Sequence, residues 1–320
     1  MSKGIAMGRI DWRLHALSGA ALLFLALLPR FWGSGYALRL LTLVFMWIAL
    51  SGCWNLMSGY TGYIDFGPVA YFGIGCYTTA ILMTRCGIPF CASIPMSALA
   101  AASIALPIGA ATLRLRGAYF AIATFAFAEA MKQILLEMDR LLGIDSFGGS
   151  HGITLPLGPT NLFFYYSMFA AALATMGVTL WVEYSKFGYA LRAIRQAEDT
   201  AEITGINTRA IKIRAYGTSA FLLGGIGGIY AYWITYITPQ DVFSVHITVH
   251  MVIMTLLGGM GTLFGPVVGA FFLTIVEETL WARFIYAYMV LIGAIILAIV
   301  MFMPQGIMGT LKSLSRHARS

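Results

Sequence analysis

Residues that could do chemistry are few in this sequence, and they lack the partners that a reaction would need. His246 and His250 have the four-residue spacing of zinc-protease helices, but no Glu follows the first His. The sequence contains no Gly-Lys dipeptide, so it has no Walker A loop for a nucleotide phosphate. The four cysteines do not show metal-ligand spacing. These residues therefore predict neither an enzyme nor a bound cofactor or metal.

Two carboxylates stand in or beside apolar runs, where a charge needs a reason. Glu129 lies within FAIATFAFAEAMKQILLE, and Lys132 follows it by about one helical turn. We expect these two side chains to pair with each other, while Glu129 also remains a candidate for the translocation path. Asp65 lies within TGYIDFGPV at a predicted loop-to-span junction, where we expect it to be solvated.

The longest polar interval is Gly188–Arg214, GYALRAIRQAEDTAEITGINTRAIKIR. It and the residue just before it hold six of the twenty Lys and Arg residues: Lys186, Arg192, Arg195, Arg209, Lys212 and Arg214. Because short basic loops of membrane proteins tend to stay in the cytoplasm, this loop is predicted to face the cytosol.

Part of this loop has the pattern of a short helix. Ala, Leu, Ile and Glu recur at helical spacing, and Gly188 and Gly205 bracket the run. Gly205 is a predicted stop signal, and Arg195 is spaced to form a weak surface pair with Glu198. Such a helix suits either a docking surface or a solvated connector, and the residues alone favour neither.

The elements that must position these residues are membrane helices. The chain is 59% hydrophobic and 10% charged, with a mean hydropathy of +0.82, whereas soluble domains carry about a quarter charged residues. The net charge of +7 is spread over the ends of apolar runs, which indicates topology rather than nucleic-acid binding. The sequence therefore predicts an all-α, polytopic membrane protein, a single transmembrane domain over residues 1–320.

About 8–10 membrane segments are expected, with both termini in the cytosol. An apolar run ending near Leu28 is interpreted as an uncleaved first span. The run Ile247–Trp281 is broken at Gly258–Pro266 and is either two short helices or a re-entrant loop. The remaining predicted spans are Ala37–Met57, Gly67–Met83, Ala92–Leu113, Ala118–Leu136, Asn161–Val182, Ala215–Ile237 and Ala287–Met303.

Glycines in these spans occur in two patterns, one typical of helix packing and one of helix interruption. Gly224 and Gly228 are four residues apart, as are Gly261, Gly265 and Gly269, which favours close helix packing. In addition, the sequence FGPV occurs twice, at Phe66–Val69 and Phe264–Val267. Matching interruptions in two halves of a transporter point to broken helices along the pathway. The candidate broken-helix residues are Gly62, Phe66, Gly67, Gly259, Gly261, Gly265 and Pro266.

Several long motifs, in order, resemble one family. These are NLMSGYTGYIDFGPVAYFGIGCYTTAIL, LRLRGAYFAIATFAFAEAMKQILLE, FGGSHGI, the Gly188–Arg214 loop and LLGGMGTLFGPVVGAFFLTIVEE. Together they are similar to the LivM-type permease of branched-chain amino acid ABC transporters. The resemblance implies a bacterial inner-membrane permease that pairs with a second, related permease. Two cytosolic ATPases, which bind ATP and Mg²⁺, and a periplasmic binding protein would complete the transporter.

The resemblance also implies a role for the polar loop. Residues 188–214 would be the coupling loop on which the ATPases dock, and Ile203-Thr204 departs from the fullest form of its motif. Its implied coupling residues are Gly188, Arg192, Arg195, Glu198, Ala201, Glu202 and Gly205. Related permeases serve urea, short amides or other amino acids, so those substrates remain alternatives. An ion-coupled secondary transporter is the competitor from another class, and a purely structural scaffold gives no reason for such a loop.

Overall fold

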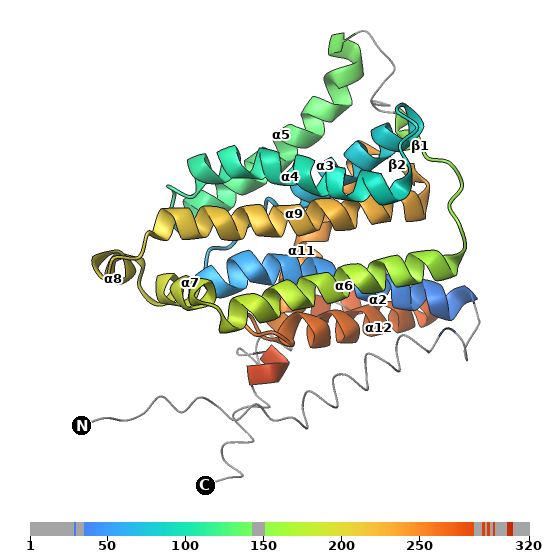
Figure 1. Ribbon diagram of the computed structural model, residues 1–320. Helices are drawn as coiled ribbons and strands as arrows, with labels where there is room; N and C mark the ends of the chain where they lie inside the picture. Colours follow the sequence, from blue (N-terminus) through green and yellow to red (C-terminus); the bar gives the residue numbers. More distant parts are fainter. Residues whose placement is uncertain are drawn as a thin grey trace.

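The computed structural model describes residues 29, 35–142, 151–284, 290–291, 293–294, 297 and 306–309. Over these residues the protein is a bundle of helices with one two-residue ladder (Figure 1). The helices are α2 (Gly35–Trp54) with the π-helix η1 (Asn55–Gly59), α3 (Pro68–Thr84), α4 (Phe90–Thr112), α5 (Ala118–Leu142), α6 (Asn161–Tyr184), α7 (Lys186–Gln196), α8 (Glu198–Ile203), α9 (Thr208–Ile234), α10 (Pro239–Val242), α11 (Val245–Gly258) and α12 (Gly265–Arg283). Strands β1 (Ile153–Thr154) and β2 (Tyr236–Ile237) pair antiparallel.

The predicted class, a polytopic all-α membrane protein, is confirmed. Within the described residues, five helical stretches are long and apolar enough to cross a membrane: Gly35–Gly59, Phe90–Thr112, Ala118–Met138, Asn161–Tyr184 and Pro239–Gly258. The predicted first span ending near Leu28, the last span Ala287–Met303 and the predicted cytosolic termini fall almost wholly outside the described residues.

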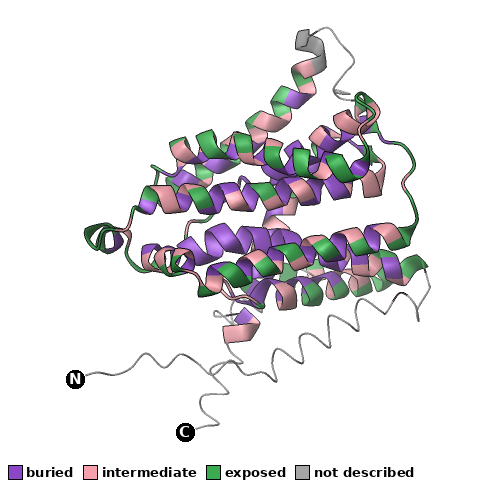
Figure 2. Cartoon of the chain, viewed as in Figure 1, coloured by how far each residue is buried: buried purple, intermediate pink, exposed green. Residues whose placement is uncertain are grey.

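Helix α9 crosses the centre of the packing. It lies against α3 and α4, while α2 packs against α6, α11 and α12 (Figure 1). Most residues of α2 and α3 are buried (Figure 2). Glycines permit these approaches: a Cβ on Gly75 would lie 2.1 Å from the Gly224 carbonyl oxygen, and one on Gly224 would lie 2.5 Å from Ala101 Cβ. The helix-packing prediction is therefore confirmed for Gly224, and also for Gly228, whose Cβ would lie 2.5 Å from Thr79 Oγ1.

The glycine-broken run contains two helices, α11 and α12, that pack side by side. A Cβ on Gly258 would lie 1.7 Å from the Gly265 carbonyl oxygen, and one on Gly269 would lie 1.8 Å from that of Met254. Gly265 and Gly269 thus pack helices as predicted. The same prediction is wrong for Gly261, which lies in the connecting loop with φ +77°.

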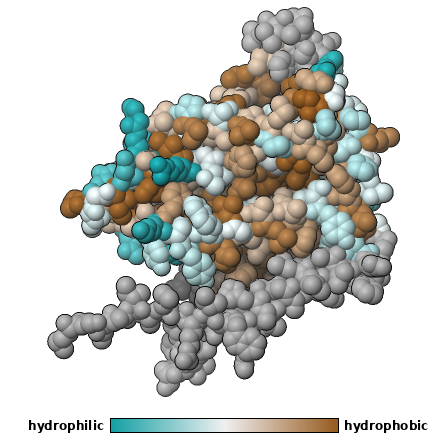
Figure 3. Space-filling model, in the orientation of Figure 1, coloured by the Kyte–Doolittle hydropathy of each residue, from teal (hydrophilic) through white to brown (hydrophobic). Residues whose placement is uncertain are grey.

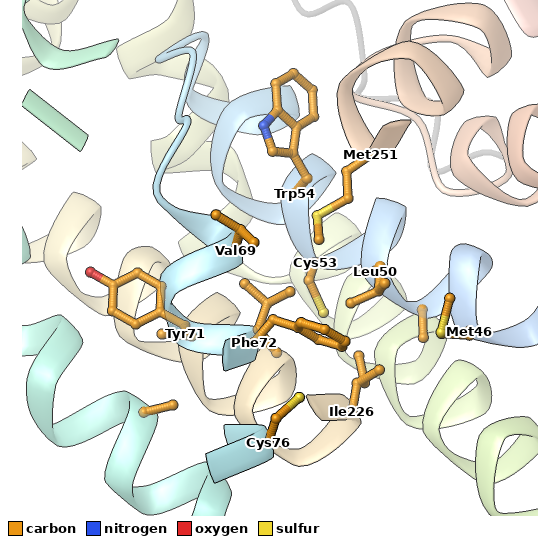
Figure 4. Close-up of a cluster of buried hydrophobic side chains, with 14 of the residues drawn as sticks. Met46, Leu50, Cys53, Trp54, Val69, Tyr71, Phe72, Cys76, Ile226 and Met251 are labelled. Carbon is orange, nitrogen blue, oxygen red and sulfur yellow. The ribbon is translucent and has the colours of Figure 1, made fainter. Parts of the chain in front are cut away.

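Helix α9 begins seven residues earlier than the predicted span, so Thr208–Arg214 belongs to a helix and not to the loop. Asn207 explains the start, because its side chain accepts a hydrogen bond from the Ala210 amide at 3.0 Å. Helices α7 and α8 lie at one end of the bundle, and β1, β2 and α10 lie at the other (Figure 1). Between the ends is the apolar core, where Leu50, Phe72 and Ile226 face one another (Figure 4).

Candidate coupling site

A tight turn after α6 sets the direction of α7. Ser185 caps α7 by accepting a hydrogen bond from the Gly188 amide at 3.2 Å. Gly188 lies so close to the end of α6 that a Cβ there would be 1.8 Å from the Val182 carbonyl oxygen. Leu191 and Ile194 follow at helical spacing and are buried. The apolar face of α7 therefore rests on the bundle, and its polar face is left outside.

The predicted single helix from Gly188 to Gly205 is two helices. Ala197 has extended backbone, with φ −161° and ψ 105°, and separates α7 from α8. Glu198 and Asp199 then occupy the first turn of α8, where acidic side chains stabilise a helix start. The predicted stop is confirmed: Gly205 has φ +85°, and the Ile206 amide donates to the Ala201 carbonyl at 3.1 Å.

Arg192 of α7 contacts Glu183 at the end of α6. Its Nη2 donates to the Glu183 carbonyl oxygen at 2.8 Å, and its Nη1 lies 3.6 Å from Glu183 Oε1. The other oxygen of this carboxylate accepts a hydrogen bond from Tyr60 Oη at 2.7 Å. Arg192 is thereby linked through Glu183 to the residue that follows η1.

Arg195 contacts the first broken-helix segment, which runs from η1 to the start of α3. Its Nη1 donates to the Gly59 carbonyl oxygen at 2.6 Å, and its Cγ would lie 3.2 Å from a Cβ on Gly62. The predicted pair between Arg195 and Glu198 is therefore wrong. The break at Ala197 turns Glu198 away from the helical register of α7, and the two side chains find partners far along the chain.

The two broken-helix segments meet beside Arg195. Asn55, which is fully buried, accepts a hydrogen bond from the Gly261 amide at 2.7 Å and donates one to the Thr262 carbonyl at 3.0 Å. Gly59 lies against the same place, since a Cβ on it would be 2.9 Å from the Gly261 nitrogen. A Cβ on Gly261 would in turn lie 2.2 Å from Arg195 Nη1. One arginine of α7 thus touches both segments.

A side-chain oxygen accepts a hydrogen bond from a glycine amide at the start of both α3 and α12. Asp65 Oδ1 accepts from the Gly67 amide at 2.8 Å before α3, and Thr262 Oγ1 accepts from the Gly265 amide at 3.0 Å before α12. Pro266, like Pro68, lies in the first turn of its helix. The FGPV repeat therefore marks two equivalent helix starts.

Asp65 is not solvated as predicted, because it is only 3% exposed. Its carbonyl oxygen accepts from Trp54 Nε1 at 2.8 Å, and the Phe66 amide beside it donates to Thr124 Oγ1 at 3.1 Å. These contacts draw the segment into the core. Gly259, at the end of α11, has φ +121° and begins the second segment. Glu129 is held within α5, 2.5 Å from Lys132 Nζ, so the predicted pairing is confirmed.

Glu198 is the centre of a second network. Its Oε1 accepts from Lys212 Nζ of α9 at 2.5 Å, and its Oε2 accepts from Tyr63 Oη. Lys212, only 3% exposed, also donates to the Leu113 carbonyl at 3.3 Å. Burial alone would raise the pKa of the Glu198 carboxyl, but hydrogen bonds from Lys212 and Tyr63 outweigh it, so that pKa lies below its usual value.

Sequence reasoning missed Asn55 and Tyr63, and counted Lys212 only as a basic loop residue. An Asn inside the apolar run Ala37–Met57 was the available signal, since a polar side chain at membrane depth needs a partner. Nothing local marks Tyr63 or Lys212, because their partner Glu198 is distant in sequence.

The outer surface of α8 is left uncovered. Ala201 is buried, whereas Ile203 is 87% exposed and no atom lies within 4 Å of a Cβ placed on Gly205. Glu202 accepts from Thr208 Oγ1 at 2.6 Å and so ties the end of α8 to the start of α9. Hydrophilic side chains gather at this end of the molecule, beside the apolar middle (Figure 3).

The protein is thus a helical membrane bundle whose polar end contacts two interrupted helices. This architecture is that of a multi-pass permease. Residues 36–300 match the family described as branched-chain amino acid transport system / permease component, and the chain belongs to that family. It is thus the permease component of a bacterial ABC transport family, and not a catalytic enzyme.

The chain is 26% identical over 314 residues to the high-affinity branched-chain amino acid transport system permease protein LivM of Escherichia coli, covering 90% of this chain and 73% of that protein. The LivM protein of Salmonella typhimurium is 24% identical with the same coverage. LivH of E. coli is 26% identical over 145 residues, which are 43% of this chain and 44% of LivH. No solved structure matches.

Proposed function

We propose that this chain is the permease subunit of an ABC importer for leucine, isoleucine and valine. It pairs with a second homologous permease subunit, and two cytosolic ATPases bind ATP and Mg²⁺ and dock on α7 and α8. A periplasmic binding protein delivers the substrate. The family match and the names of the LivM and LivH relatives support the substrate class.

The observation that carries the proposal is the double attachment of α7 and α8. Their outer faces are exposed, while Arg195 and Glu198 reach inward to the two segments that precede α3 and α12. A force applied to α7 and α8 would therefore reach the first interrupted segment through hydrogen bonds and the second through the close approach of Arg195 to Gly261. This is the mechanical requirement for a coupling element between an ATPase and a permease.

The permease itself performs no covalent chemistry. Closure of the ATPase dimer displaces α7 and α8, and the attached helices rock so that the path opens to one side of the membrane at a time. Helices α3 and α12 begin at the attached segments, so a displacement of α7 and α8 acts on them directly. A coupled import cycle of this kind has two conformations, and nucleotide binding shifts the population between them.

The substrate and the energy source are tested by uptake of radiolabelled leucine into proteoliposomes. We expect uptake only when this chain, the second permease, the ATPases, the binding protein and ATP are all present. Competition by valine and isoleucine, but not by urea or acetamide, supports the substrate class. Uptake by this chain alone, driven by an ion gradient, would make it a secondary transporter and contradict the proposal.

The attachment is tested by Arg195→Gln, with Arg209→Gln as the matched control. Arg209 is an exposed arginine of the same region whose hydrogen bond to the Ala110 carbonyl is long, at 3.4 Å. Loss of a charge-assisted hydrogen bond of ~1.5–3 kcal/mol should lower leucine transported per ATP hydrolysed roughly tenfold or more in Arg195→Gln. Equal coupling ratios in the two variants would remove Arg195 from the coupling path.

Docking on α8 is tested by Ile203→Asp, with Leu157→Asp as control. Both side chains are apolar and almost fully exposed, at 87% and 91%, but Leu157 follows β1 at the other end of the bundle. We expect Ile203→Asp to reduce co-purification of the ATPases and Leu157→Asp to leave it unchanged. If the ATPases co-purify equally with both variants, the docking surface lies elsewhere.

A further inference from the structure

A cavity of about 560 Å³ extends from the apolar core, where Leu50 and Phe72 line it, to the start of α2 and the end of α9, which lie away from α7 and α8. Helices α2, α3, α9, α11 and α12 supply its walls, which are mainly aliphatic and aromatic. The main apolar contributors are Leu43, Trp47, Phe72, Tyr230, Trp233 and Ile247. Its volume is within the usual range of small-molecule sites, and such walls suit an apolar side chain.

A second cavity lies beside the first, which we call the chamber. It has a volume of about 370 Å³ and is lined by residues of β2, α10 and the start of α11, including the polar Gln240, Asp241 and Ser244. The two cavities share Tyr230, Ile234 and Ile247 and therefore adjoin. The second cavity thus places polar side chains next to the apolar chamber.

Two opposite charges border the chamber. Arg39 of α2 and Glu278 of α12 both line it. Tyr36 Oη donates a hydrogen bond to Glu278 Oε1 at 2.7 Å, which orients the carboxylate, and none of the hydrogen bonds found among the described residues uses Oε2. A guanidinium can bind a carboxylate, and a carboxylate can bind an ammonium group. The chamber thus offers one partner for each charge of a zwitterion.

We propose that this chamber binds a zwitterionic α-amino acid with an apolar side chain on its way through the permease. The inference rests on the proposed function and adds the place and the mode of recognition. Arg39 binds the α-carboxylate, Glu278 binds the α-ammonium group, and the side chain lies among Leu43, Trp47 and Trp233. Urea and short amides have neither the paired charges nor the apolar surface that these walls match.

The test is protection of an introduced cysteine against a small, water-soluble thiol reagent, in the assembled transporter in proteoliposomes without ATP. Leu43→Cys is introduced into a C86S/C91S background, because Cys86 and Cys91 are the exposed native thiols among the described residues and Cys53 and Cys76 are buried. Leu157→Cys, in the exposed loop after β1, is the control.

Leucine at four times its dissociation constant should slow labelling of L43C about fivefold and leave L157C unchanged, because the unoccupied fraction falls by 1 + [L]/Kd. In Glu278→Gln or Arg39→Gln, loss of ~1.4 kcal/mol weakens binding about tenfold, so protection falls to about 1.4-fold. Arg283→Gln, an exposed charge change on α12 outside the chamber, should keep the fivefold protection. Isoamylamine and 4-methylvalerate, each lacking one charge, should protect L43C little at the same concentration.

Equal labelling of L43C with and without leucine, in a transporter that still imports leucine with ATP, overturns this inference and leaves the proposed function intact. Labelling that is blocked in bilayers without leucine but fast in detergent assigns the chamber to lipid and overturns it too. Absence of ATP-driven leucine uptake in the complete transporter would instead contradict the proposed function itself.

Discussion

The two ends of the bundle differ in how they are held. At the α7–α8 end, polar side chains join separate elements: Asn55 of η1 meets Gly261, Arg195 of α7 meets Gly59, and Glu198 of α8 meets Lys212 of α9. Toward the opposite end, helices α2, α3, α9, α11 and α12 surround a cavity of about 560 Å³. The bundle is therefore closed by specific contacts at the α7–α8 end and hollow toward the other.

This difference has a physical basis. Hydrogen bonds of buried groups are costly to break without replacement, so the contacts at the α7–α8 end hold one arrangement firmly. A cavity lined by aliphatic and aromatic walls has no such directional constraints. Changes at the first end should therefore act on stability and coupling, and changes at the second should act on substrate affinity.

Asn55→Leu should have the largest effect on stability, because it removes a buried side chain that joins the two broken-helix segments. It leaves the Gly261 amide and the Thr262 carbonyl without their partner, at about 1–3 kcal/mol for each unsatisfied group. The thermal midpoint of the detergent-purified protein measures the loss. Ser103→Ala, which removes an exposed local hydrogen bond of α4, is the control. A loss no larger than that of the control would show that Asn55 does not join the two segments.

Gly261→Ala should have the next largest effect, and Gly117→Ala, in the turn between α4 and α5, is its matched control. Both glycines have positive φ, +77° and +59°, so both alanines carry backbone strain of roughly 1–2 kcal/mol. Only at Gly261 would the new methyl lie 2.2 Å from Arg195 Nη1, whereas no atom lies within 4 Å of that at Gly117. We therefore expect both variants to lose stability, with the larger loss, and less leucine transported per ATP hydrolysed, in Gly261→Ala. Similar coupling in both variants would show that Arg195 adapts without consequence.

Glu198→Gln should have a moderate, pH-dependent effect. The folded protein lowers the pKa of this carboxyl below its unfolded value of about 4.3, so the ion pair stabilises the fold above that value. The stabilisation is lost as the pH falls through the folded pKa. Unfolding measured from pH 7 to acid should show a smaller pH dependence in Glu198→Gln than in the parent. Glu202→Gln, an exposed change on the same helix, should keep the parental dependence.

Tyr36→Phe should have the smallest effect on leucine binding, and it tests whether the orientation of Glu278 matters in the chamber. It removes the hydrogen bond that orients Glu278, but Tyr36 is 62% exposed and water can replace its hydroxyl. We expect leucine binding to weaken about twofold, measured by protection of L43C, with the thermal midpoint unchanged. A lower thermal midpoint in Tyr36→Phe would give this tyrosine a structural role instead.

The sequence was sufficient for the features that depend on local pattern. Apolar runs predicted most helices, the FGPV repeat predicted interruptions where α3 and α12 in fact begin, and the spacing of Glu129 and Lys132 predicted their pair. Long-range partners could not be predicted in this way. Arg195 was assigned to Glu198 by helical spacing, but its actual partner, Gly59, is 136 residues away.

The position of Asp65 shows the same limit. Its neighbours in sequence are those of an exposed loop, yet Trp54, Thr124 and Gly67 surround it after folding. The break at Ala197 was also hidden, because alanine is a good helix former. It arises where Glu198 turns toward Lys212 and Tyr63, which are brought there by α9 and the segment before α3.

The contact of Arg195 with both Gly59 and Gly261 has a consequence for the order of events in transport. If each interrupted segment had its own attachment to α7, the two could release at different times, and half-released states would let solute leak. Under the coupling that we propose, an arginine shared by both segments would make release a single, cooperative event, with both segments held or both free. Futile ATP hydrolysis and passive leak should then rise together in any variant that weakens the contacts of this arginine.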